Sequence, residues 1–222
     1  GLAVMLRVGG RAQVARVLVF LLLRIDVYLV GYFLGRDAVG VYAVAAAFTE
    51  MMQRVPDVAS LVLFAKVIRR QDSPELSLRV GQAVLLFALV SAAALLLLGR
   101  WLIALFFPEY PDAYTPLVWL LPGAVFCAVA AAYNAKIAGD GYPPVTMWAP
   151  AIALAANVGL NLWLIPRLGL RGAALSTSVT YTMWGLIVTR EYIRRTGADW
   201  RLLLRPPPLR LVLEQALRGR RG

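Results

Sequence analysis

Two opposite charges lie close together inside an apolar stretch of the chain. Residues 19–35, VFLLLRIDVYLVGYFLG, carry Arg24 and Asp26 near the middle of a run that, with the residues before it, is long enough to cross a bilayer. A charge at that depth costs about 2.5–3.5 kcal/mol on insertion scales, so such residues usually face a polar cavity or a partner. We therefore expect this stretch to border a polar path through a membrane.

The spacing of the polar residues in this stretch indicates how they are shared between faces. In one continuous helix turning about 100° per residue, Arg24 and Tyr28 lie within about 60° of each other with Tyr32 beside them, whereas Asp26 lies about 200° from Arg24. The two charges therefore cannot pair across one face. We expect Arg24 to face a cavity together with the tyrosines, and Asp26 to face another helix or a different wall.

A second apolar segment carries three charges on one face. Glu50, Arg54 and Asp57 lie at i, i+4 and i+7 near its middle, and the first spacing suits a Glu–Arg contact. Two interpretations stay open. The residues form a neutralised pair that fixes helix packing, or they form a cavity wall that meets an anionic head group or takes up a proton. Mid-membrane charges in two spans favour the second interpretation.

Polar residues later in the chain are typical of helix packing. Asn157 and Asn161 have i,i+4 spacing, and we expect them to hydrogen-bond between helices, where such contacts contribute about 0.6 kcal/mol on average. The Ser/Thr cluster in residues 176–182 and the small residues 172–174 predict close helix contact in the same way.

Composition places the chain among integral membrane proteins. It is 60% hydrophobic and 16% charged over 222 residues, with a mean hydropathy of +0.70, against about 45–50% and about 25% in soluble domains. The net charge of +11 arises from arginines between and after apolar runs, which argues against nucleic-acid binding. The chain has no histidine, and Cys127 is its only cysteine. Disulfides, thiolate metal sites and histidine-dependent catalysis are therefore excluded within this chain, and we predict no enzyme, metal or cofactor.

The hydrophobic runs predict six transmembrane helices and a basic tail. The spans cover about residues 12–34, 39–67, 76–98, 113–138, 144–166 and 172–193, and a short amphipathic piece at 101–107 follows the third. We expect one all-α domain over residues 1–195 and a basic cytoplasmic tail over 196–222 that attracts anionic lipid. Because the chain begins at Gly1 rather than Met, we expect it to be a piece of a longer protein.

The distribution of Lys and Arg predicts the orientation in the membrane. With the C-terminal tail inside, six spans place 17 basic residues on the cytoplasmic side and 4 on the other. The 17 are Arg7, Arg11, Arg16, Lys66, Arg69, Arg70, Arg79, Lys136, Arg190, Arg194, Arg195 and six arginines from Arg201 to Arg221; the 4 are Arg36, Arg100, Arg167 and Arg171. Both termini are therefore expected to be cytoplasmic.

Several motifs in order resemble one transporter family. RIDVYLVGYFLGRDAVGVYAVAAAFTE at residues 24–50, GDGYPP at 139–144 and NVGLNLWLIPRLGLRGAALSTSVTY at 157–181 are similar to polysaccharide and lipid-linked oligosaccharide flippases of the multidrug/oligosaccharidyl-lipid/polysaccharide exporter superfamily. The resemblance covers about residues 6–206. Arg54 and Asp57 depart from the family pattern, since they make the second span more charged.

The resemblance implies a fold and a mechanism. This chain would be the C-terminal, six-helix lobe of a two-lobe exporter in a bacterial inner membrane, with the N-terminal lobe as its partner. The exporter would expose a polyprenyl-pyrophosphate-linked oligosaccharide alternately to the two membrane faces, for the synthesis of surface or exported polysaccharide. Arg24 would contact phosphate in a cationic cavity, and Tyr28 and Tyr32 would contact sugar or isoprenoid. We expect Arg54 to line the same cavity and to form a gate or coupling pair with Glu50. Asp26, Glu50 and Asp57 would act in gating or coupling.

Three other functions are alternatives for this sequence. A cation-coupled multidrug antiporter of the same superfamily would need a cavity with more acid than base. A membrane glycan polymerase or ligase would need a large outer loop with catalytic residues, and the longest predicted outer loop, 99–112, has no histidine and little acid. A scaffold for a glycan assembly complex would support assembly without flipping.

Overall fold

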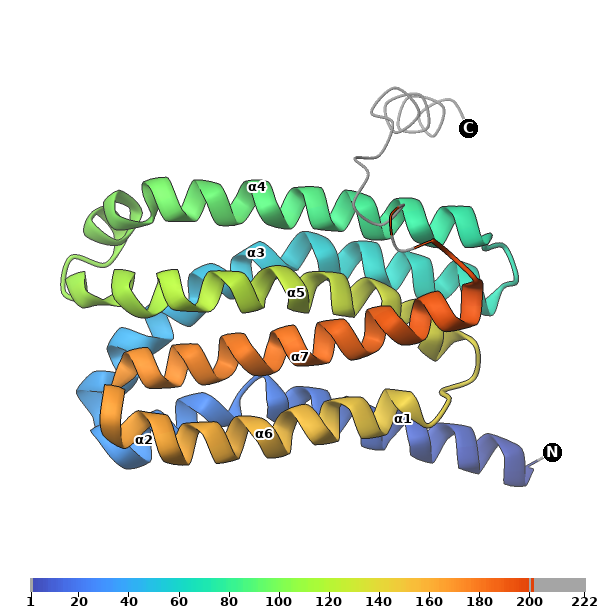
Figure 1. Cartoon of the computed structure of the whole chain (residues 1–222), viewed down its shortest axis with the longest axis horizontal. Helices are drawn as coiled ribbons and strands as arrows, with labels where there is room; N and C mark the ends of the chain where they lie inside the picture. Colours follow the sequence, from blue (N-terminus) through green and yellow to red (C-terminus); the bar gives the residue numbers. More distant parts are fainter. Residues whose placement is uncertain (1, 200, 202–222) are drawn as a thin grey trace.

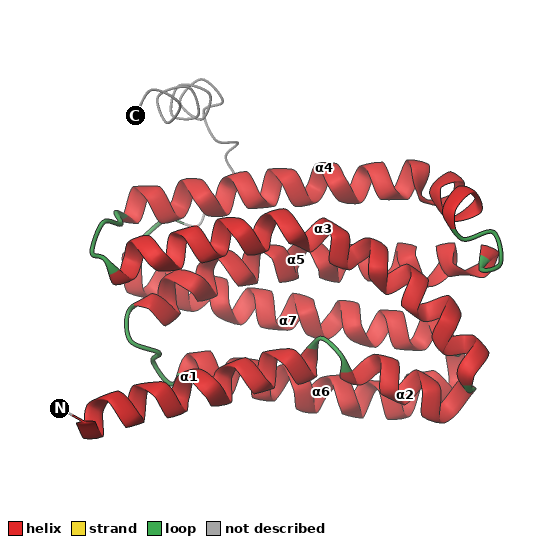
Figure 2. Cartoon of the chain, turned by 180° about the vertical axis from the view of Figure 1, so that it is seen from behind, coloured by secondary structure: helices red, strands yellow, loops and turns green. Residues whose placement is uncertain are grey.

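The protein folds as a bundle of long helices. Its structure, a computed structural model, describes residues 2–199 and 201, and within these residues it contains helices and no strand (Figure 2). The helices are α1 (Leu2–Leu22), α2 (Ile25–Leu34), α3 (Arg36–Ile68), α4 (Pro74–Phe106), α5 (Tyr114–Gly139), α6 (Val145–Leu168) and α7 (Leu170–Thr196), with a short 3₁₀ helix, η1 (Pro111–Ala113), before α5. The predicted all-α class is confirmed. Most of the predicted tail, residues 202–222, lies outside the described residues.

Among the residues that the structure describes, four segments are long and apolar enough to cross a membrane. They are Val8–Leu34, Glu75–Phe106, Pro111–Gly139 and Val145–Leu168. The two remaining predicted spans fall on α3 and α7, which have 33 and 27 residues. Both are long enough to cross the hydrocarbon core, but α3 carries charges at its middle and α7 is rich in Ser and Thr.

The first predicted span is not one continuous helix, as expected, but two. Leu23 and Arg24 separate α1 from α2, and Arg24 has φ −130° and ψ −20°. The Arg24 amide donates to the Leu21 carbonyl at 3.1 Å, an i→i−3 bond that tightens the end of α1. The break gives α2 an N-terminus of its own, and Asp26 lies in its first turn, where a negative charge is favourable.

The third predicted span is longer than expected. The piece predicted as a separate amphipathic segment at 101–107 continues the same helix, so that α4 runs unbroken from Pro74 to Phe106. Ser73 caps its first turn by accepting a hydrogen bond from the Leu76 amide at 3.1 Å. Gly99 does not end the helix, and it lies close to the side chain of Leu117 on α5.

The helices run back and forth, so that alternate turns gather at the two ends of the bundle. The N-terminus, the α3–α4 and α5–α6 turns and the C-terminal end of α7 lie at one end (Figure 1). The α2–α3, α4–α5 and α6–α7 turns lie at the opposite end, and the α1–α2 break lies between the two ends. We call the first the basic end, since its turns and helix ends carry Lys66, Arg69, Arg70, Arg79, Lys136, Arg190, Arg194 and Arg195. Arg36, Arg100, Arg167 and Arg171 lie toward the opposite end.

Helix α5 is at the centre of the bundle and packs against α3, α4 and α7. Its closest neighbour is α7, where a Cβ atom added at Gly123 would lie 2.4 Å from the Ser178 Cα. The Ser178 hydroxyl also contacts the Gly123 amide at 2.7 Å. Gly185 also lies close to the backbone of Phe126, where an added Cβ atom would lie 2.8 Å from the Phe126 carbonyl oxygen. Small residues therefore let α5 and α7 approach closely, as helices in membranes commonly do.

Candidate functional site

A cavity of about 300 Å³ lies at the break between α1 and α2, and α3, α5 and α7 form its other walls. Apolar residues provide much of the lining, including Val19, Phe20, Leu120 and Trp184. The polar lining residues are Arg24, Asp26, Thr49, Glu50, Gln53, Arg54, Asp57, Thr177 and Tyr181. Five of the predicted site residues therefore border one space: Arg24, Asp26, Glu50, Arg54 and Asp57.

The central contact in this cavity joins the helix break to α3. Arg24 Nη1 donates to Glu50 Oε1 at 2.7 Å, and Arg24 Nη2 donates to Glu50 Oε2 at 3.2 Å. Such a fork of two parallel hydrogen bonds is the strongest arrangement for guanidinium and carboxylate groups. The two side chains remain 46% and 39% exposed. The pair is therefore accessible from the cavity and is not sealed in the core.

The expected contact between Glu50 and Arg54 is absent, and Glu50 pairs with Arg24 instead. The sequence favoured an i,i+4 pair on one helix, but the broken first span brings Arg24 close enough for a two-point contact between helices. Arg54 forms no ion pair within 4.0 Å of any acidic residue in the described part of the chain. It interacts electrostatically with Asp57, which also lines the cavity.

Asp26 has a different environment from Arg24. Only 4% of it is exposed, and one carboxylate oxygen accepts hydrogen bonds from the Tyr42 hydroxyl at 2.7 Å and the Thr177 hydroxyl at 2.9 Å. The other oxygen accepts from the Val27 amide at 2.9 Å. These donors connect α2 to α3 and α7. No ion pair to Asp26 is present among the described residues, so hydroxyl and amide donors alone satisfy this buried carboxyl group.

The structure does not place the two predicted tyrosines in this cavity. Tyr28 and Tyr32 are 69% and 81% exposed, and neither lines the cavity that contains Arg24. The expected shared face assumed a constant turn per residue through Arg24, and the backbone break at that residue removes this assumption. Both rings lie on the outer surface of α2, where they can contact a neighbouring molecule or domain.

Gln53, which lines the cavity, and Tyr42, which contacts Asp26, were not singled out from the sequence. Thr177 was included there only in a Ser/Thr cluster expected to pack helices. The Gln53 side chain donates to the Ala124 carbonyl at 2.7 Å and so connects the cavity wall on α3 to α5. Tyr42 and Thr177 hold Asp26. Gln53 lies three residues after Glu50, on the same helix face, and this spacing is a signal that could have found it. The role of Tyr42 and Thr177 depends on tertiary packing and leaves no comparable local signal.

The two predicted packing asparagines are buried between α6 and α7, away from the cavity lining. The Asn157 amide donates to the Thr180 hydroxyl at 3.0 Å, which is a contact between helices. The Asn161 amide donates to Asn157 Oδ1 at 2.8 Å, within α6. Both side chains are 0% exposed. The side-chain oxygen of Asn161, Oδ1, has no hydrogen-bond partner in the described part of the protein.

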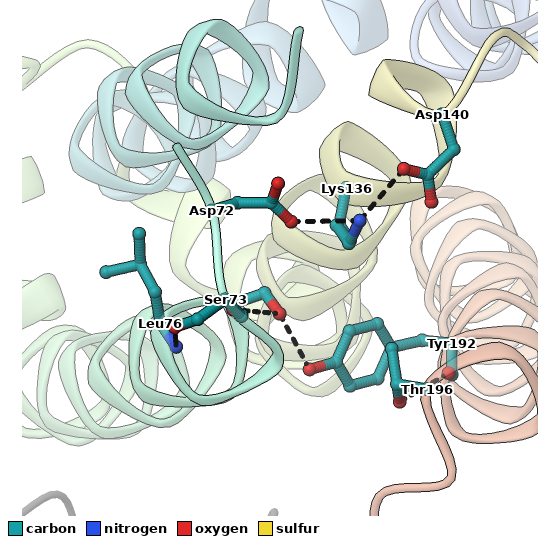
Figure 3. Close-up of polar contacts among 8 residues, drawn as sticks. Asp72, Ser73, Leu76, Lys136, Asp140, Tyr192 and Thr196 are labelled. Carbon is teal, nitrogen blue, oxygen red and sulfur yellow. Dashed lines mark hydrogen bonds and ion pairs between the residues drawn. The ribbon is translucent and has the colours of Figure 1, made fainter. Parts of the chain in front are cut away.

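A second polar cluster holds the basic end together (Figure 3). Lys136 on α5 lies between Asp72 in the α3–α4 turn and Asp140 in the α5–α6 turn, at 2.9 and 2.8 Å. The Tyr192 ring on α7 stacks on Tyr133 with centroids 4.2 Å apart, and its hydroxyl contacts the Ser77 hydroxyl at 3.0 Å. This cluster connects both turns to α4, α5 and α7. From its place in the sequence, Lys136 was expected only to add to the basic residues on the cytoplasmic side.

No metal centre can be assigned from the described side chains. Within residues 2–199 and 201, no group of three or more Cys, Asp or Glu residues is arranged to hold an ion. Cys127, which borders the central cavity, is buried and unpaired with another cysteine.

Comparison with known proteins finds one distant relative with an assigned name. The chain is 27% identical over 176 residues to "Probable flippase AglR" of Haloferax volcanii, an alignment that covers 75% of this chain and 37% of the relative. The chain thus spans well under half the length of the protein that it matches. No protein-family model matches the chain. No solved structure matches it either. The chain is therefore a helical membrane protein with distant homology to a probable flippase.

Proposed function

We propose that this chain is one lobe of a flippase that moves a polyprenyl-pyrophosphate-linked oligosaccharide across a bacterial inner membrane for polysaccharide synthesis. The observation that carries this proposal is the position of Arg24. Its guanidinium lies at a helix break, inside a membrane-spanning segment, and reaches into a cavity. Non-helical backbone at membrane depth is tolerated only where protein buries it or where it lines a cavity, and transporters use such breaks at their substrate sites.

A pyrophosphate group matches the chemistry of Arg24. A guanidinium binds phosphate oxygens with the same two-point geometry that it uses for a carboxylate, and in this structure Glu50 occupies that position. Arg54 supplies a second cation on the cavity wall. We propose that the pyrophosphate displaces Glu50 from Arg24, so that the ion pair is the closed state of a gate. Asp26 and Asp57 act in coupling, and Tyr28 and Tyr32 contact sugar or isoprenoid on the outer surface of α2.

The proposed topology has six membrane spans and two lobes. The two helices with more polar sequences, α3 and α7, lie in the same bundle as the four apolar segments and have comparable lengths. The gathering of basic residues at one end of the bundle supports placing that end, and both termini, in the cytoplasm. The half-exposed Arg24–Glu50 pair and the exposed tyrosines of α2 are the surface that an N-terminal lobe would face.

One observation favours a second candidate, a cation-coupled multidrug antiporter. The cavity is lined by three acidic residues, Asp26, Glu50 and Asp57, against the two basic residues Arg24 and Arg54. A cavity with more acid than base suits cationic substrates. Asp26 is buried and hydrogen-bonded by hydroxyl and amide donors, however. The accessible charges at the cavity are the Arg24–Glu50 pair, Arg54 and Asp57, so acid and base are balanced there.

The test compares Arg24→Ala with Arg24→Lys in the complete transporter. Flipping of lipid-linked oligosaccharide in proteoliposomes and surface polysaccharide in cells should be lost in Arg24→Ala at normal expression. Arg24→Lys should retain part of the activity, since it keeps the charge and loses the two-point geometry. Normal polymer and flipping in Arg24→Ala would contradict the proposal. Efflux of cationic drugs that requires Glu50 or Asp57, without Arg24, would favour the antiporter.

A further inference from the structure

A second cavity opens at the basic end of the bundle, where α3 ends and α4 begins. Its volume is about 290 Å³, and Lys66, Ser73, Glu75, Leu76 and Arg79 line it. It shares no lining residue with the central cavity at Arg24. The cavity therefore requires its own explanation.

The cavity carries an unbalanced positive charge. Arg79 forms an ion pair with Glu75 at 2.7 Å, and these two charges compensate each other. Lys66 is exposed and forms no ion pair with any acidic residue in the described part of the chain. The Arg79–Glu75 pair is accessible, with side chains 31% and 70% exposed, so an anion can also draw Arg79 away from Glu75 at little cost. The cavity thus offers two cations to an anionic group.

The segment that forms this cavity is held in place by its neighbours (Figure 3). The α3–α4 turn is fixed by the 2.9 Å contact between Asp72 and Lys136. Ser73 both caps α4, through the Leu76 amide, and forms part of the cavity wall. The Gln71 amide donates to the Lys66 carbonyl at 2.9 Å and so closes the end of α3. The backbone that carries the two cations is therefore organised before any ligand arrives, which lowers the cost of binding.

An exposed apolar surface extends from the cavity toward the middle of the bundle. Along α3, Val62 and Val58 lie one and two turns before Lys66, and they are 52% and 62% exposed. Along α4, Val90 follows Arg79 by 11 residues, which places it within about 20° of the same face, and it is 61% exposed. A cationic cavity at one end of an apolar strip matches a ligand with an anionic head and a hydrocarbon chain.

We propose that this cavity binds the phosphate of an anionic phospholipid at the membrane surface, with its acyl chains along the apolar residues of α3 and α4. Lys66 and Arg79 contact the phosphate. Basic cavities between transmembrane helices on the cytoplasmic side are suited to such head groups, and each basic residue near the surface strengthens attraction to anionic lipid. This inference rests on the membrane embedding proposed above and not on the flipping of any substrate.

The test measures the binding of phosphatidylglycerol to the chain in detergent, by native mass spectrometry and by the shift in melting temperature. Phosphatidylcholine is the neutral comparison lipid. The variant is Lys66→Gln/Arg79→Gln, and the matched control is Arg36→Gln/Arg100→Gln, which removes the same charge from exposed residues toward the opposite end. The first variant should bind phosphatidylglycerol roughly tenfold more weakly. The control should bind it as the unchanged protein does.

Three results would overturn the lipid site. They are unchanged binding in Lys66→Gln/Arg79→Gln, an equal loss in the control variant, and equal stabilisation by inorganic phosphate at the same concentration. Both variants should melt close to the temperature of the unchanged protein when no lipid is added. Lys66, Arg36 and Arg100 are exposed, and the partly exposed Arg79–Glu75 pair contributes little to stability. Flipping by a complete transporter that carries Lys66→Gln/Arg79→Gln should persist in neutral lipid, so the lipid site and the proposed function can fail independently.

Discussion

Both terminal nitrogens of Arg24 donate to the two carboxylate oxygens of Glu50, a residue 26 positions later in the sequence and on another helix. The pair closes the gap between the helix break and α3. Because about two-fifths of each side chain is exposed, its net contribution to folding is small, about 0–1 kcal/mol. An ion pair with good geometry that contributes little to the free energy of folding can open and close repeatedly. This property distinguishes a gate from a structural ion pair.

Glu50→Gln should alter transport much more than stability. The glutamine keeps the size of the side chain but removes the charge that competes for Arg24, so a lipid-linked pyrophosphate should bind roughly threefold to tenfold more tightly and turn over more slowly. The melting temperature should shift by no more than a few degrees. Binding and turnover measured in proteoliposomes check both expectations. Unchanged affinity together with a large loss of stability would show that the pair is structural.

Tyr42→Phe should destabilise the protein. The variant removes the 2.7 Å hydrogen bond to a carboxyl group that is only 4% exposed, and such a loss in the protein interior costs about 1–3 kcal/mol. Thr177 and the Val27 amide continue to hold Asp26, which keeps the cost below that of a free buried charge. Thermal unfolding in detergent measures the change. Tyr32→Phe is the control, because its ring is 81% exposed and its removal of a hydroxyl should have almost no effect.

The positions of most helices could be predicted from the sequence, but the contacts between the helices could not. Long apolar runs separated by short turns predicted where most of the helices lie, since length and hydropathy are local properties. They did not predict the division of the first span or the extension of α4 to Phe106. The break at Arg24 was missed because residues 19–26 contain neither Gly nor Pro. The partner of Glu50 was misassigned for the same reason. An i,i+4 pair can be read along one helix, whereas the Arg24 contact depends on how α2 packs on α3.

Gly123→Ala should be strongly destabilising, whereas Gly159→Ala should not. A Cβ atom at Gly123 would lie 2.4 Å from the Ser178 Cα, and backbone cannot rotate away as a side chain does. Forcing α5 from α7 should cost about 1–3 kcal/mol or more. At Gly159, on α6, an added Cβ meets nothing within 4 Å, so the higher helix propensity of alanine should stabilise by up to about 1 kcal/mol. Melting temperatures that move in the same direction for both variants would contradict this packing.

The Lys136 contacts at the basic end should be unequal in strength. Asp72 is 14% exposed and Asp140 is 39% exposed, although their distances to the Lys136 Nζ are nearly the same, at 2.9 and 2.8 Å. An ion pair shielded from water is screened less and its loss leaves a poorly hydrated charge. Asp72→Asn should therefore lower the free energy of unfolding by about 1–3 kcal/mol, and Asp140→Asn by less than about 1 kcal/mol.

A double-mutant cycle separates the direct contact from indirect effects. The coupling between Lys136→Met and Asp72→Asn should exceed that between Lys136→Met and Asp140→Asn, and only the second should fall markedly when the salt concentration is raised. Equal couplings would mean that both carboxylates are equally solvated. In that case the α3–α4 turn would be held by the Ser73 cap and the Tyr192 contact more than by Lys136, and the lipid cavity beside it would be less rigid than proposed.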